Sequence, residues 1–151
     1  MSLRGIIKKS NVAVICTTDD PSNDLKWHEQ IKNDASFTTK VYPAMRPDTV
    51  VNIEKSGWRE YLTNRLAKSE NQEIKSYDNL LEVLKRRIDY FDKMGCRAAD
   101  HGVTELFCQE GAKAPEIFKK ALGGEALTPE EIAGFKTALL LFFASEYQKR
   151  G

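Results

Sequence analysis

The feature that most constrains this chain is a set of three short runs that each carry charged residues at their end: VAVICTTDDP at 12–21, KVYPAMRPD at 40–48 and GCRAADHG at 95–102. Each run places an aspartate at the end of a predicted strand. In parallel α/β sheets and barrels, substrates bind at the carboxyl ends of the strands. The three runs therefore predict an α/β fold in which they form one wall of an active site.

The same three runs resemble, in their residues and in their order along the chain, the ends of the second, third and fourth barrel strands of uronate isomerases. These are sugar-acid isomerases of the amidohydrolase superfamily. The matching residues are TTDDP at 17–21, RPD at 46–48 and CRAADHG at 96–102, and the resemblance covers nearly the whole chain. It implies a partial (β/α) TIM-type barrel with about three parallel strands and several helices. Members of that family are much longer and begin the barrel with a His-x-His strand, which this sequence lacks. We therefore expect an internal segment of a longer enzyme.

The chain of 151 residues is shorter than an eight-stranded barrel, which needs about 250. Length favours one domain, residues 1–151. Residues 12–16 are apolar and β-branched, which predicts a strand buried on both faces. Residues 37–42 predict a second strand that ends at Pro43, and a weak third strand at 97–99 rests mainly on its position and the resemblance.

The spacing of apolar residues predicts helices at 24–33, 58–66, 80–91 and 115–122, with a loop after Gly102. The second and third of these helices form an insertion at about 50–94. The strongest helix signal is the capping box formed by Thr128 and Glu131, which starts a last helix whose apolar face is expected to cover the sheet. Unpaired strand edges and this apolar face also predict self-association of the chain.

Composition excludes several classes of partner. The 23 basic and 22 acidic residues leave a formal charge of +1, so there is no electrostatic case for nucleic acid or an anionic membrane as a partner. No apolar run approaches the roughly 20 residues that span a bilayer. Cys16, Cys96 and Cys108 lack Cys-x-x-Cys spacing, which favours thiols in a reducing compartment and a cytoplasmic location.

Four residues are candidates for substrate binding. Arg46 follows a predicted strand and precedes Pro47 and Asp48, where its planar guanidinium could bind the carboxylate or hydroxyls of a sugar acid. The alternative is a salt bridge from Arg46 to Asp48 or Asp20 that only ties loops together. Asp19 and Asp20 could position a substrate hydroxyl or serve acid/base chemistry, but Asp-Asp-Pro is also an ordinary turn before a helix.

Asp100 and His101 form an adjacent acid–imidazole pair at a predicted strand end, and we expect them to be catalytic. The alternative is a structural histidine at a sheet end, and His28 is expected to pack on a helix face. Two histidines that lie far apart cannot build a multi-histidine metal site, so no metal ligand or other cofactor is assigned to this segment. The resemblance implies a zinc-like divalent metal held elsewhere in the full enzyme.

The resemblance also implies an activity and a substrate. The full enzyme would interconvert D-glucuronate and D-fructuronate, and D-galacturonate and D-tagaturonate, by moving a proton between C2 and C1 through an enediol. The isolated segment is expected to be inactive. The alternative function is a non-catalytic α/β binding or interaction domain that has kept the barrel motifs.

Overall fold

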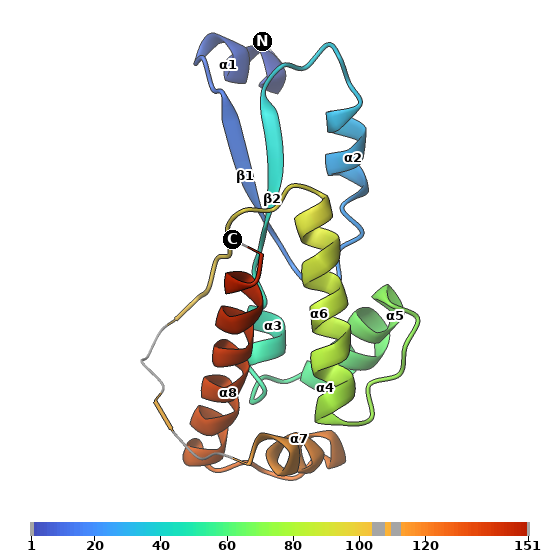
Figure 1. The fold of residues 1–151 in the computed structure, drawn as a ribbon, viewed down its shortest axis with the longest axis vertical. Coiled ribbons are helices and arrows are strands. Elements are labelled where there is room, and N and C mark those ends of the chain that lie inside the picture. The colour runs from blue at the N-terminus through green and yellow to red at the C-terminus, as the bar shows by residue number, and fades with distance from the viewer. Residues whose placement is uncertain (1, 104–107, 110–112, 151) are drawn as a thin grey trace.

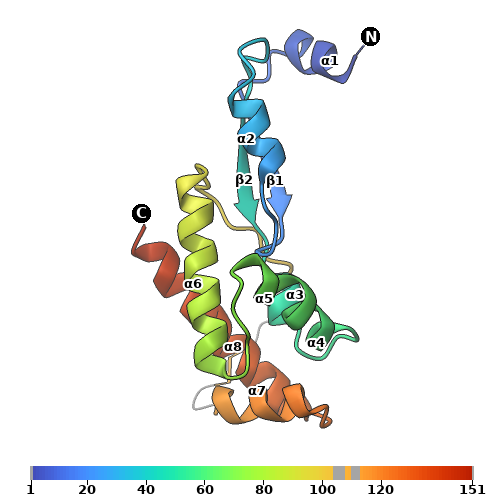
Figure 2. The ribbon, with the colours of Figure 1, turned by 90° about the vertical axis from the view of Figure 1, so that its right-hand side faces the viewer.

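The computed structural model describes residues 2–103, 108–109 and 113–150, and much of the loop predicted after Gly102 lies outside this part of the chain. The two strands and the first two helices lie at one end of an elongated molecule, and most of the short helices lie at the other (Figures 1 and 2). In chain order the elements are α1 (Leu3–Lys9), β1 (Val14–Asp19), α2 (Lys26–Lys32), β2 (Lys40–Met45), α3 (Asp48–Val51), α4 (Trp58–Tyr61), the π-helical turn η1 (Leu62–Leu66), α5 (Ala67–Ser69), α6 (Tyr77–Lys93), α7 (Ala114–Gly123) and α8 (Pro129–Gln148).

The fold is mixed α/β and contains a parallel two-stranded sheet in which β1 pairs with β2 from Val14 opposite Lys40 to Asp19 opposite Met45. The sequence pattern predicts both strands a few residues before their observed positions. The predicted third strand is reduced to one parallel bridge between Met45 and Ala99. In it the Met45 amide donates to the Ala98 carbonyl at 3.3 Å, and the Asp100 amide donates to the Met45 carbonyl at 2.9 Å.

Pro43 explains why the third strand stops at one bridge. The prediction that Pro43 ends β2 is wrong, since the strand continues through it to Met45. Backbone amides along β2 point alternately to its two neighbours. Those of Lys40 and Arg46 donate toward β1, so the backbone nitrogens at 43 and 45 face the 96–99 segment. Proline has no amide hydrogen, and a parallel ladder cannot continue past it on that side.

The prediction that the first strand is buried on both faces is also wrong. Side chains of β1 alternate between exposed and partly buried, and Val14 keeps 50% of its surface exposed. The partly buried positions lie toward α2, where Thr17 contacts His28. Because helix covers only one face of this short sheet, half of the β1 side chains remain in solvent.

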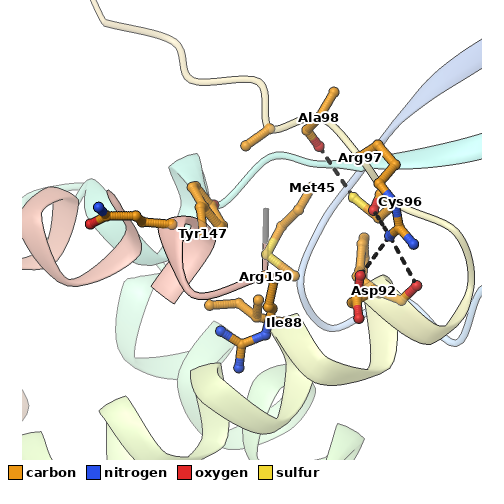
Figure 3. A pocket seen from close by; sticks show the side chains of 11 residues that line it. Met45, Ile88, Asp92, Cys96, Arg97, Ala98, Tyr147 and Arg150 are labelled. Atoms are coloured by element: carbon orange, nitrogen blue, oxygen red, sulfur yellow. Dashed lines mark hydrogen bonds and ion pairs between the residues drawn. The ribbon is translucent and has the colours of Figure 1, made fainter. Parts of the chain in front are cut away.

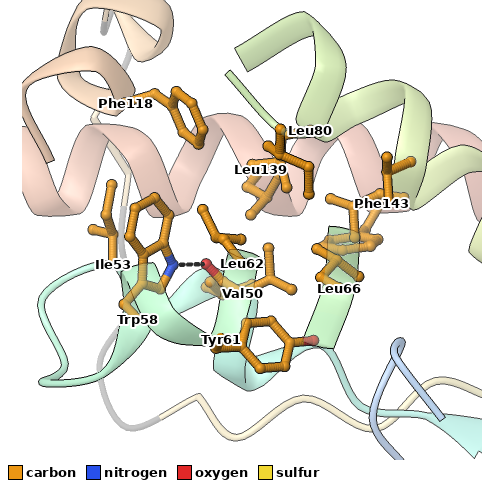
Figure 4. Close-up of a cluster of buried hydrophobic side chains, with 14 of the residues drawn as sticks. Val50, Ile53, Trp58, Tyr61, Leu62, Leu66, Leu80, Phe118, Leu139 and Phe143 are labelled. Carbon is orange, nitrogen blue, oxygen red and sulfur yellow. Dashed lines mark hydrogen bonds between the residues drawn. The ribbon is translucent and has the colours of Figure 1, made fainter. Parts of the chain in front are cut away.

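The hydrophobic core lies among the helices rather than under the sheet (Figure 4). Trp58 anchors it: its indole Nε1 donates to the Val50 carbonyl at 2.8 Å, and its ring meets the edges of Phe118 and Phe135 at centroid distances of 5.6 and 6.1 Å. Such edge-to-face pairs add to the stabilisation from apolar burial. Fully buried side chains from η1, α6 and α8 add to the cluster, namely Leu62, Leu66, Leu80, Leu84, Leu139 and Phe143.

The capping box at the start of α8 is confirmed, with Thr128 Oγ1 accepting from the Glu131 amide and Glu131 accepting from the Thr128 amide. The apolar face of α8 packs mainly against α3, α6 and α7, so the expectation that it chiefly covers the sheet is wrong. The helices of the 48–93 stretch fill that space instead. No helix in the described ranges is both long enough and apolar enough to cross a membrane.

Candidate active site at the strand ends

Arg46 lies at the carboxyl end of β2 between two carboxylates. Its backbone amide continues the ladder by donating to the Asp19 carbonyl at 2.8 Å. Its Nε donates to Asp48 Oδ2 at 2.7 Å, and its Nη1 lies 3.3 Å from Asp100 Oδ2. The hydrogen bond to Asp48, and then the charges of Asp48 and Asp100, raise the pKa of Arg46 above its usual value. The structure therefore brings three of the six predicted site residues into one charged cluster.

Gly102 closes this cluster from the third run. Its amide donates to both carboxylate oxygens of Asp48, at 3.0 and 3.2 Å. A Cβ at this position would lie 2.5 Å from Asp48 Oδ2 and 2.8 Å from Arg46 Nη2. A side chain at this position would therefore push the ends of the Asp48 and Arg46 side chains out of their present places. The sequence contains Gly102 within the third run, but nothing in the pattern distinguishes it from an ordinary turn glycine.

Replacing Gly102 with alanine should displace the Arg46–Asp48 pair and lower about tenfold any activity of the full-length protein that depends on this cluster. The matched control is Gly123→Ala, because a Cβ there meets its nearest atom at 3.7 Å, an ordinary contact. Steady-state kinetics of the two variants measure the effect. Equal activity of both would show that the cluster does not need this close approach.

Asp19 and Asp20 turn to other partners, so the structure does not bring their carboxylates to Arg46. Asp19 is 9% exposed, and its Oδ2 accepts from Thr17 Oγ1 at 2.5 Å. Asp20 Oδ1 accepts from the amide and hydroxyl of Ser22, at 2.9 and 2.6 Å, and from Tyr61 Oη at 2.8 Å. Burial, and then the charge of Asp20, raise the pKa of the Tyr61 hydroxyl. Asp20 thus forms the turn that was the alternative interpretation of Asp-Asp-Pro.

The loop after β1 is held by Arg87 of α6, which the sequence analysis missed. Arg87 is 5% exposed, and it donates from Nε to the Pro21 carbonyl at 2.7 Å and from Nη2 to the Asn23 carbonyl at 2.6 Å. Its Nη1 pairs with Glu70 at 3.1 Å, and its guanidinium lies 4.4 Å from the centre of the Tyr90 ring. An arginine in the polar pattern of a helix carries no sign of such a role, since its partners lie 64 to 66 residues away.

His101 packs against α8. Its ring lies 6.1 Å from that of Phe143 and 6.0 Å from that of Tyr147. Burial lowers the pKa of His101 below its usual value, against the opposing charges of Asp48 and Asp100. Burial thus favours the neutral imidazole over its charged form. Within the described part of the chain its Nδ1 is buried without a hydrogen-bond partner.

A cavity of about 290 Å³ lies beside the charged cluster but not at it (Figure 3). It opens between the 96–99 segment and the C-terminal ends of α6 and α8, and its walls include Met45, Ile88, Cys96 and Tyr147. None of the charged residues at the strand ends lines it. The cavity walls also include Asp92, Arg97, Gln148 and Arg150. We place the candidate site at the charged cluster instead, because three of the predicted site residues meet there.

The residues present do not fit a metal site. Residues 2–103, 108–109 and 113–150 contain no group of three or more His, Cys, Asp or Glu side chains that could hold an ion. His28 lies on α2 and His101 follows the bridge at Ala99, each with different neighbours. No step of the chemistry proposed below passes through a metal.

A family model described as glucuronate isomerase matches residues 1–151. The chain belongs to this family. The uronate isomerase of Caldicellulosiruptor saccharolyticus is 43% identical over the whole chain, which covers 33% of that protein. The crystal structure of the Thermotoga maritima uronate isomerase matches 99% of the chain with a TM-score of 0.89 at 29% identity, and that of the Caulobacter crescentus glucuronate isomerase matches 95% with a TM-score of 0.83 at 25% identity.

The chain spans about a third of the length of the curated uronate isomerases that it matches. The resemblance stated from the three runs is confirmed by the family match and by both structures. A non-catalytic binding or interaction domain is the less favoured alternative, since these relatives carry the name of an isomerase.

Proposed function

We propose that this chain forms one wall of the active site of a uronate isomerase and represents a partial (β/α) barrel. In this proposal residues 1–151 are a single barrel segment, with residues 50–94 as a helical insertion. The parallel pairing of β1 with β2 and the bridge from Met45 to Ala99 support it, because they set the ends of all three polar runs at one edge. The free thiols of Cys16, Cys96 and Cys108 agree with a cytoplasmic location.

The proposed reaction is the interconversion of D-glucuronate and D-fructuronate, or of D-galacturonate and D-tagaturonate. A proton moves between C2 and C1 through an enediol, so the site must hold the sugar oxygens and provide a group that accepts and returns the proton. Asp100 and His101 are the proposed catalytic pair in this segment. The neutral imidazole of His101 is the group suited to accept a proton.

The observation that carries the proposal is the position of Arg46 between Asp48 and Asp100. A sugar hydroxyl both donates and accepts hydrogen bonds, and this cluster offers N–H donors and carboxylate acceptors side by side. The Arg46 side chain is 42% exposed, so its remaining donors can reach a ligand. One positive and two negative charges leave the cluster with a formal charge of −1, which favours the hydroxyl-bearing part of a uronate over its carboxylate.

Assays of the whole isomerase chain test this function directly. It should convert D-glucuronate to a ketose, whereas the 151-residue chain alone should not. Asp100→Asn should lower kcat/KM about tenfold, because the amide removes a charge that holds Arg46. Asp92→Asn is the control, since Asp92 lies on α6 and pairs with Arg97 rather than with Arg46. Turnover by the isolated chain at the rate of the whole enzyme would contradict the proposal.

We also propose that the 151-residue chain self-associates when it is expressed alone. In the described part of the chain no strand pairs with the outer edge of β1, and Val14 and Trp27 are 50% and 63% exposed. Sedimentation velocity over a dilution series should show a concentration-dependent shift. Val14→Lys should weaken it, since a charge on an edge strand opposes pairing. A strict monomer at high concentration would contradict the prediction.

A further inference from the structure

Thr17, Asp19 and His28 form a chain of hydrogen bonds between β1 and α2. Thr17 and Asp19 are two residues apart on β1, so their side chains share the face that lies toward α2. Thr17 Oγ1 lies 2.5 Å from Asp19 Oδ2 and 2.7 Å from His28 Nε2. Asp19 and His28 are 9% and 8% exposed. The expectation that His28 packs on a helix face is met in its burial, but its polar contacts were not foreseen.

The distances fix the direction of these hydrogen bonds. The Thr17 hydroxyl has one proton, and the Asp19 carboxylate at 2.5 Å is a closer and stronger acceptor than the Tyr42 carbonyl at 3.3 Å. With its proton given to Asp19, the hydroxyl oxygen must accept from His28, so Nε2 carries a hydrogen. His28 Nδ1 is buried without a partner among the described residues. A hydrogen there would be an unpaired buried donor, which leaves the neutral Nε2-protonated ring.

The second oxygen of Asp19 is left for another partner. Across the described ranges, no residue forms a hydrogen bond or ion pair with Asp19 Oδ1. This oxygen is also not among the buried polar atoms that lack a partner, so it keeps some contact with solvent. Its carboxylate ends β1 directly beside Arg46, whose amide donates to the Asp19 carbonyl. A largely buried carboxylate with one free oxygen at a strand end is suited to accept a hydrogen bond from a ligand.

We propose that His28 is a positioning residue that acts through Thr17 to hold the Asp19 carboxylate, so that Asp19 Oδ1 accepts a hydrogen bond from a hydroxyl of the uronate. This inference rests on the proposed isomerase function. It gives Asp19 a substrate contact that is separate from the Arg46 cluster. It also gives α2, which contributes no residue to that cluster, a part in substrate binding.

Substitutions at Thr17 in the whole isomerase test the relay. Thr17→Val keeps the shape of the side chain and removes the hydroxyl, so kcat/KM for D-glucuronate should fall at least about tenfold. Thr17→Ser keeps the hydroxyl and should stay within about twofold of the unmodified enzyme. Thermal unfolding should show that both variants are folded. A loss of kcat/KM in Thr17→Val that Thr17→Ser restores then reports the hydroxyl and not the fold. Equal kinetics of the valine and serine variants would overturn the proposal.

Substitutions at His28 test the donor itself. His28→Gln places an amide N–H near the position of Nε2 and should retain most of the activity, whereas His28→Leu should lose as much as Thr17→Val. Equal activity of the glutamine and leucine variants would overturn the role of His28.

Nitrogen NMR of the imidazole in the unmodified protein gives a readout that needs neither a variant nor activity. The hydrogen is expected on Nε2, and a ring protonated on Nδ1 alone would overturn the relay. If the full-length protein does not turn over any uronate, the proposed function fails. The NMR result still decides separately whether Thr17, Asp19 and His28 are hydrogen-bonded as proposed.

Discussion

Arg46→Lys in the whole isomerase is expected to lower kcat/KM for D-glucuronate about 100-fold. Arg46 uses Nε for Asp48 and Nη1 for Asp100, and its other N–H groups are directed in a fixed plane. Lysine keeps the charge, but its single ammonium cannot serve both carboxylates and a substrate oxygen in that geometry. The loss should therefore exceed that of any other charge-conserving substitution at the strand ends.

The matched control is Arg97→Lys, which makes the same chemical change in the third run. Arg97 pairs with Asp92 at 2.5 Å, and its side chain is largely exposed. Its activity should stay within about twofold of the unmodified enzyme, because exposed ion pairs contribute little. Steady-state kinetics of both variants decide the matter. Losses of similar size would mean that Arg46 serves only to tie loops together.

Arg87→Met is expected to lower the free energy of unfolding by about 3 kcal/mol. The substitution removes the hydrogen bonds to the Pro21 and Asn23 carbonyls and leaves Glu70 without its partner. Methionine fills much of the volume, so the loss reports mainly the polar contacts. Urea unfolding of the full-length protein measures the effect, and the midpoint of Arg87→Met should lie below that of the unmodified protein.

Arg86→Met provides the control for this measurement, because Arg86 is the neighbouring arginine on α6 and pairs with Glu82 at the surface. Its midpoint should remain nearly unchanged. A midpoint for Arg87→Met that matches the control would show that the three contacts of Arg87 do not stabilise the loop.

The sequence predicted the positions of the charged residues better than the strands that carry them. Arg46, Asp48 and Asp100 of the second and third runs meet as expected, because parallel strands bring their carboxyl ends to one edge, whereas Asp19 and Asp20 of the first run do not join them. The third strand could not be judged from its own residues, since its length is set by the missing amide hydrogen of Pro43 on the neighbouring strand. A pairing of this kind depends on which face of β2 the proline presents.

The partners of Asp19 and Asp20 were beyond the sequence for a related reason. Two adjacent aspartates at a strand end give no sign of which elements will lie beside them. Here α2 supplies His28 to Asp19 through Thr17, and α4 supplies Tyr61 to Asp20. Both helices reach the strand end only through tertiary packing, which local spacing does not encode.

The contact between Arg87 and the loop after β1 also sets an order of events during protein synthesis. The Pro21 carbonyl and Arg87 are 66 residues apart. At about 5 to 20 residues per second, a ribosome needs roughly 3 to 13 seconds to add the residues between them. Throughout that interval β1 and the loop after it have already been made while their clamp has not. The end of β1 can therefore become rigid only after Arg87 has been made, and chaperones that meet the nascent chain before then would encounter this edge while it is still open.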